Sequence, residues 1–157
     1  MIKSMTTSNL LRITLTWLLL ALLCSPALAA SPTSTSEILV GNHAAEKGDL
    51  DKAIRHFSAA IESGKLSKEN LAIAYNNRGS AYDDKGATDK AIKDFSKAIE
   101  LNPKYDAPFF NRSHAYERKG SIAEAYSDME KAALLEPDDQ DFQQRLLYLK
   151  SRMGSAN

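Results

Sequence analysis

The sequence has a single cysteine and no excess of charge of either sign. Cys24 alone cannot form an internal disulfide, which excludes a small disulfide-stabilised scaffold. The 20 Lys and Arg residues balance 20 Asp and Glu residues. The chain therefore lacks the polycationic field that avid, sequence-independent binding to nucleic-acid phosphates requires, and no nucleic-acid partner is expected.

The one extended apolar run, residues 13–24, is too short to span a bilayer comfortably. It follows a polar segment that carries Lys3 and Arg12, and it precedes Pro26 and the small residues Ala27 and Ala29. This order is typical of a secretory signal peptide. We therefore expect residues 1–29 to be removed, which leaves a periplasmic or secreted protein with no membrane span.

Two other interpretations of the N-terminal segment stay open. An uncleaved segment would anchor the protein to a membrane. A lipoprotein signal ending at Cys24 is the weaker interpretation, because the large residue Leu23 stands where a small one normally precedes the acylated cysteine. Cleavage after Ala29 would leave no cysteine in the mature chain, which suits an oxidising compartment.

The sequence does contain an internal repeat. Residues 72–105 align without a gap on residues 106–139, and both segments carry Asn-Arg and Lys-Gly pairs at matching positions. Residues 41–62 align in the same way on residues 79–100. There are thus three units, and the first has four extra residues near Gly64 to Glu69, which we interpret as a loop insertion.

Each unit has the pattern of two helices. In the second unit, Ala91, Phe95 and Ala98 belong to one apolar stripe at helical spacing. Gly48, Gly86 and Gly120 stand where the first helix of each unit must end, because glycine adopts a left-handed C-cap without steric cost. Alanines recur where the two helices of a unit would cross closely, at positions 53, 60, 91, 98, 125 and 132.

These units resemble tetratricopeptide repeats, whose 34-residue helix–turn–helix pattern has the same small, aromatic and proline positions. The resemblance implies an all-α, right-handed superhelical solenoid of three helix–turn–helix repeats and a C-terminal capping helix. The expected segments are a flexible tether at 30–36, repeats at 37–71, 72–105 and 106–139, and a capping helix at 140–153 with a polar outer face.

The resemblance also implies that the first helices line a concave groove that binds an extended peptide or a partner's helix. Asparagine amides there would hold a peptide backbone, and large apolar side chains would add specificity. The alternative is that the asparagines only cap or hydrate the helix surface. The candidate groove residues are Ile38, Asn42, Ile73, Asn76, Asn77, Ser80, Asp84, Phe110, Asn111 and His114.

The best-known groove of this family grips an acidic C-terminus with asparagines and basic residues. Its basic positions fall here on Ile38, Ala107 and Asn111. The groove positions carry one basic residue, Arg118, and four acidic residues, which are Glu46, Asp83, Asp84 and Glu117. The groove is therefore acidic unless the side chains of Arg78 and Arg112 turn into it. We therefore predict a neutral or mildly basic protein partner rather than an acidic chaperone tail.

No catalytic or metal-binding pattern stands out. His43, His56 and His114 have no second ligand at helical spacing, so neither a zinc site nor another cofactor is expected. A glycosylation sequon at Asn111 falls inside an expected helix. The sequence thus favours a noncatalytic adaptor, with weak self-association through an exposed end as a further expectation.

Two other functions stay open. A chaperone-like holdase of the same fold would expose a broad apolar groove. An enzyme, the less favoured alternative, would need His114 to lie with Glu117 or Asp84 in a closed pocket.

Overall fold

The computed structural model describes residues 33–154, which form seven α-helices and, within that range, no β-strand. All of the described residues belong to one compact unit. The signal peptide expected at 1–29 and the start of the expected tether, residues 30–32, lie outside the described residues. The helices are α2 (Ser34–Glu46), α3 (Leu50–Glu62), α4 (Lys68–Asp84), α5 (Thr88–Leu101), α6 (Asp106–Arg118), α7 (Ile122–Leu135) and α8 (Gln140–Gly154).

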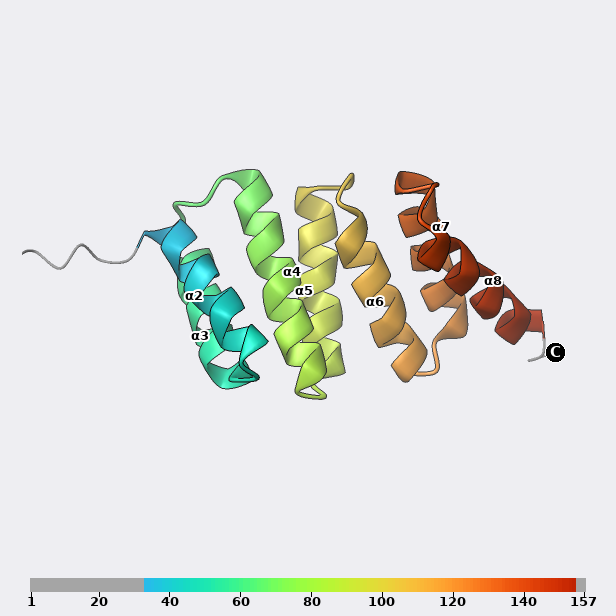
Figure 1. Ribbon diagram of the computed structural model, residues 1–157, viewed down its shortest axis with the longest axis horizontal. Coiled ribbons are helices and arrows are strands. Elements are labelled where there is room, and N and C mark those ends of the chain that lie inside the picture. The colour runs from blue at the N-terminus through green and yellow to red at the C-terminus, as the bar shows by residue number, and fades with distance from the viewer. Residues whose placement is uncertain (1–32, 155–157) are drawn as a thin grey trace, which may run out of the picture. The chain divides into compact units, whose positions relative to one another are not determined.

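The helices stack in chain order, as Figure 1 shows. Each helix contacts the next one, and α4 also contacts both α2 and α6. The result is a row of three antiparallel pairs, α2/α3, α4/α5 and α6/α7, followed by α8 against α7. The predicted all-α superhelical stack is confirmed. No helix within the described range combines the length and hydropathy needed to cross a bilayer.

Small residues allow the two helices of each pair to approach closely. The six alanines expected at the helix crossings are all fully buried. Phe57 and Phe95 fill the space beside them, and both are almost inaccessible to solvent. Burying such a side chain stabilises the fold by roughly 1.5–3 kcal/mol.

Glycine ends the first helix of every pair. Gly48, Gly86 and Gly120 have φ angles of 76°, 77° and 79°, in the left-handed region. The amide of the following residue donates back across the helix end, as from Asp49 N to Ala44 O at 2.9 Å. This is the Schellman arrangement, which satisfies carbonyls that the helix end would otherwise leave without partners.

One expected boundary was wrong, and a second was only partly right. Ser34–Ser36 are not part of a tether, because Thr33 Oγ1 accepts a hydrogen bond from Ser36 N at 3.2 Å and starts α2 at Ser34. The extra residues of the first unit are divided between a loop and a helix, since residues 63–67 connect α3 to α4 as expected, whereas Lys68 and Glu69 belong to α4. Ser67 caps α4 by accepting from Asn70 N at 3.2 Å, so the insertion lengthens α4 to 17 residues, about one turn more than the 13 of α2 and α6.

The last helix closes the stack. Asp139 Oδ1 accepts from Asp141 N and Phe142 N at 2.9 and 3.1 Å, which caps the first turn of α8. Phe142 and Leu149 are buried against α6 and α7. A wholly polar outer face was expected for α8, but this face is partly apolar, since Leu147 is 67% exposed and Tyr148 is 42% exposed.

Candidate functional site

Four asparagines form a continuous hydrogen-bonded ladder across α2, α4 and α6. Asn111 Nδ2 donates to Asn76 Oδ1 at 3.0 Å, Asn76 Nδ2 donates to Asn77 Oδ1 at 3.2 Å, and Asn77 Nδ2 donates to Asn42 Oδ1 at 2.8 Å. Every amide in this asparagine ladder points the same way along the row of first helices. The ladder therefore has a donor end at Asn42 and an acceptor end at Asn111.

The two ends of the asparagine ladder keep unused hydrogen-bonding capacity. Asn76 and Asn111 use both amide hydrogens, since Asn76 also donates to Tyr105 OH at 3.4 Å and Asn111 to Ser80 Oγ at 3.5 Å. Within residues 33–154, the Asn42 amide nitrogen and the Asn111 amide oxygen make no hydrogen bond to protein, and neither atom is buried. An amide carries two donors and two acceptor lone pairs, so this surface can bind both a carbonyl and an N–H of an extended chain.

Two candidate groove residues are not available to a partner. Ile38 is 6% exposed and packs in the core cluster with Phe57 and Ala74, so its role as an apolar anchor was wrongly predicted. Asn76 is 5% exposed and acts inside the asparagine ladder. Ile73, by contrast, is 36% exposed, and Leu39, the residue after Ile38 on α2, is 65% exposed.

At the C-terminal end, α8 covers part of the expected groove. The Phe110 ring stacks on Phe142 with centroids 5.0 Å apart and meets His114 edge-on at 4.6 Å. Phe110 is therefore half-buried against the chain's own helix, and it is not the free apolar anchor that was predicted. The position of α8 depends on tertiary packing, which the repeat pattern does not reveal.

His114 belongs to an ion-pair network at this end. Arg145 Nη2 of α8 donates to His114 Nδ1 at 3.3 Å and also pairs with Glu117, and Arg152 Nη1 lies 3.8 Å from Glu117 Oε1. Burial, together with the charge of Arg145, lowers the pKa of His114. His114 and Glu117 do line one hollow, yet Arg145 contacts both of them. No group of metal-ligating side chains occurs within residues 33–154.

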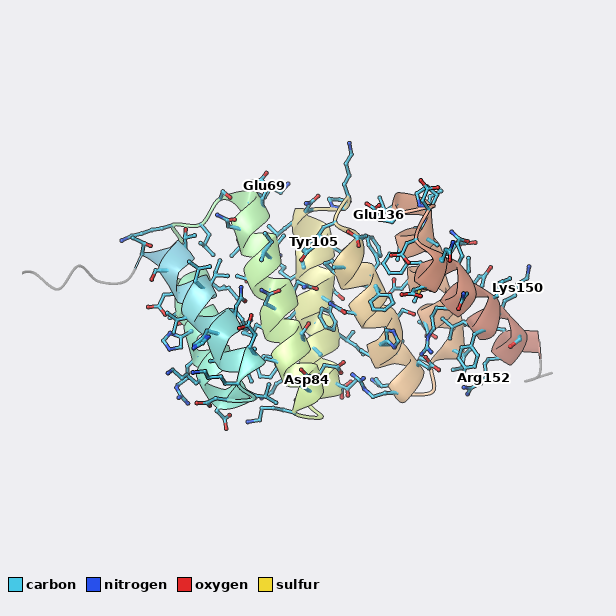
Figure 2. The ribbon with its side chains drawn as sticks, in the orientation of Figure 1. Glu69, Asp84, Tyr105, Glu136, Lys150 and Arg152 are labelled. Atoms are coloured by element: carbon cyan, nitrogen blue, oxygen red, sulfur yellow. The ribbon has the colours of Figure 1, made fainter. Side chains whose placement is uncertain are left out.

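The basic residues of the repeats do not turn into the groove. Arg78 Nε and Nη2 donate to both oxygens of Asp94 at 2.7 and 2.9 Å, and Nη1 reaches Ser58 Oγ at 3.0 Å. Arg112 repeats this arrangement with Asp128 and Ser96. Both arginines therefore bind the second helices. In the groove, Asp83 pairs with Arg118, whereas Asp84 is exposed at the C-terminal end of α4 (Figure 2).

The comparisons with known proteins identify the repeats. Residues 72–105 and 108–139 each match a family model described as tetratricopeptide repeat. No curated protein sequence matches the chain.

Several solved structures share the fold at low sequence identity. The first TPR of Spaghetti (RPAP3), bound to the HSP90 peptide SRMEEVD, is 22% identical, with a TM-score of 0.71 over 78% of this chain and 96% of that one. The Arabidopsis OM64 TPR domain is 24% identical, with a TM-score of 0.69 over 75% and 94%. The Sgt2 TPR domain from Aspergillus fumigatus is 24% identical, with a TM-score of 0.71 over 83% and 85%.

The solved structures show that the fold is similar. The family models match two of the three helix pairs, α4/α5 and α6/α7. The first pair, α2/α3, has the same glycine stop after its first helix and the same Gly-against-Phe contact as the matched pair α4/α5. The chain is a tetratricopeptide repeat protein.

Proposed function

We propose that the protein is an exported, noncatalytic adaptor that binds an extended segment of a partner protein along α2, α4 and α6. The asparagine ladder is the observation that carries this proposal. Its unused donors at Asn42 and its unused acceptor at Asn111 match the alternating carbonyl and N–H groups of a peptide backbone. Contacts of this kind hold a chain in place without requiring particular side chains.

One similar structure supports peptide binding by a domain of this fold. The Spaghetti (RPAP3) domain is bound to the HSP90 peptide SRMEEVD. In the present chain the groove acids Glu46 and Asp84 have no arginine or lysine partner within the described residues, so the partner proposed here is neutral or mildly basic. The asparagine ladder makes the groove polar, which favours an adaptor over a holdase with a broad apolar groove.

Weak self-association is proposed from two leucines on the surface, Leu134 and Leu147, which are 72% and 67% exposed.

The proposal of export is based on the N-terminal sequence, which has an apolar run at 13–24 and small residues before Ala30. N-terminal sequencing of the protein recovered from the periplasm of an expressing bacterium tests export. We expect a mature end at Ala30, and an intact Met1 end would contradict a cleaved signal.

Substitution of the asparagine ladder tests backbone recognition. Peptides selected from a random twelve-residue display library on the immobilised protein serve as probes, and calorimetry measures their affinity. We expect Asn42→Ala and Asn111→Ala each to weaken binding by about 1 kcal/mol, roughly fivefold, because each removes an end of the ladder that is proposed to contact the peptide backbone.

Asn102→Ala is the matched control. Asn102 follows α5, away from the asparagine ladder, and its side chain only accepts from Lys104 N at 3.1 Å. This variant should bind as the unaltered protein does. Equal losses in all three variants, or a library from which no peptide is enriched, would contradict groove binding.

A further inference from the structure

Three hollows recur along the groove at equivalent repeat positions. The first, of about 260 Å³, lies between α2 and α4 and is lined by Asn42, Ala45, Glu46, Phe57, Asn77, Ser80, Ala81 and Asp84. The second, of about 290 Å³, lies between α4 and α6 and is lined by Ser80, Asp83, Asp84, Phe95, Asn111, His114 and Arg118. The third, of about 310 Å³, lies between α6 and α8 and is lined by His114, Glu117, Arg118, Arg145 and Arg152.

The chain itself supplies a guanidinium to the second and third hollows. Arg118 is the last residue of α6, at the repeat position that Asp84 holds in α4, and it pairs with Asp83 in the second hollow. Arg145 reaches the third hollow from α8 and pairs with Glu117. In each case a carboxylate on a first helix is neutralised by an arginine that enters the groove.

The first hollow has the carboxylates but no such cation. Glu46 and Asp84 are the last residues of α2 and α4, and no Lys or Arg within residues 33–154 pairs with either of them. His43 Nδ1 lies 3.8 Å from Glu46 Oε2, and both of these side chains are largely exposed. Lys85, the residue after Asp84, instead pairs with Asp51 of α3. Two helix C-termini add further negative potential at this point.

We infer that the first hollow receives a lysine or arginine side chain of the partner segment. The inference rests on the proposed groove binding and assigns its specificity to one position. The cationic head would lie between Glu46 and Asp84, as the guanidinium of Arg118 lies against Asp83 one repeat further on.

The walls of the first hollow suit a side chain of this kind. Ala45, Phe57 and Ala81 give an apolar lining for the methylene stem, and long basic side chains bury such stems while their charged heads stay hydrated. The volume of about 260 Å³ is below the roughly 300–1,000 Å³ typical of small-molecule sites. Asn42 and Asn77 border the same hollow, so the backbone next to the basic residue meets the donor end of the asparagine ladder.

The test compares peptides selected on two forms of the protein. A random twelve-residue display library is panned on the unaltered protein and on the Glu46→Gln, Asp84→Asn double variant. We expect Lys or Arg to be enriched at one fixed peptide position with the unaltered protein only. The best such peptide should bind the double variant at least tenfold more weakly, because charge-assisted contacts are lost. Asp84→Lys should instead enrich Asp or Glu at that position.

Glu69→Gln is the matched control, since Glu69 is exposed on the same helix at the end opposite to Asp84 (Figure 2). It should leave the peptide preference and affinity unchanged. Enriched peptides without a fixed basic residue, or a basic preference that survives the double substitution, would overturn the inference while leaving groove binding intact. A library that yields no binder on the unaltered protein would reject the proposed function itself.

Discussion

At the scale of single residues, one repeat position requires glycine where an aromatic ring of the second helix packs against it. A Cβ atom built on Gly79 would lie 2.7 Å from Phe95 Cε1, and one on Gly41 would lie 2.6 Å from Phe57 Cε1. In the third repeat the equivalent position is Ser113, which is buried and donates from Oγ to Ala125 O at 2.7 Å. There the aromatic ring is replaced by Met129, whose flexible side chain adapts to irregular space.

Gly79→Ser should therefore destabilise the protein, by about 1–3 kcal/mol in the free energy of unfolding, because the rigid Phe95 ring must move. Adding Phe95→Met should recover part of this loss, so that the double variant is more stable than the sum of the two single effects predicts. Urea unfolding followed by circular dichroism measures both quantities. Gly154→Ser is the control, since no atom lies within 4 Å of a Cβ there; strictly additive effects would contradict this account.

At the scale of helices, one ion pair in each of the second and third repeats, Arg78–Asp94 and Arg112–Asp128, holds three helices together. Arg112 of α6 holds both carboxylate oxygens of Asp128 on α7 and donates to Ser96 Oγ on α5 at 2.7 Å. The Asp128 side chain is only 9% exposed. Breaking a buried pair from one side is strongly destabilising, because it leaves the other charge without compensation.

Asp128→Ala should thus lower the free energy of unfolding by about 2–4 kcal/mol. The loss should be at the lower end of what breaking a buried ion pair costs, because the Arg112 side chain keeps partial access to solvent. Asp89→Ala serves as the comparison. Asp89 pairs with Lys119 at 2.6 Å across neighbouring repeats, yet its side chain is 78% exposed, and solvent screens such pairs. Thermal unfolding of the two variants checks the contrast, and similar losses in both would refute it.

The same scale shows how far the sequence could predict the structure. The glycine stops and the alanine crossings follow from local periodicity, and the left-handed φ of Gly86 and the burial of Ala91 confirm both. The interior position of Ile38 did not follow, because the family's groove positions were transferred by alignment alone, whereas the stacking of the helices buries both Ile38 and its equivalent in the second unit, Asn76.

The charges of the groove were also beyond sequence reasoning. Arg118 and Asp83 lie 35 residues apart, on neighbouring first helices, and Arg145 comes from α8, outside the repeats. Their pairing depends on how the helices stack, and the stacking neutralises two of the four acids counted in the groove. The remaining two, Glu46 and Asp84, gather at one hollow.

At the scale of the whole molecule, the stack distributes stability locally. Helices contact mainly their neighbours in the row, so each repeat depends on the repeat beside it more than on the rest of the chain. The C-terminal repeat depends on α8, since Phe142 and Leu149 join Phe109 and Met129 in one core cluster. The hollow formed by α2 and α4 lies at the other end of the row.

Leu149→Ala should therefore cost about 2–5 kcal/mol, as expected for a fully buried leucine, and the damage should be confined to α6, α7 and α8. Hydrogen exchange measures this, with lost amide protection in those helices and retained protection in α2 and α3. Leu147→Ala, on the same helix but 67% exposed, should change little. Because the altered core lies far from Glu46 and Asp84, Leu149→Ala should keep its affinity for a basic peptide within about twofold. Protection lost evenly along the chain would instead mean that the stack unfolds as one unit.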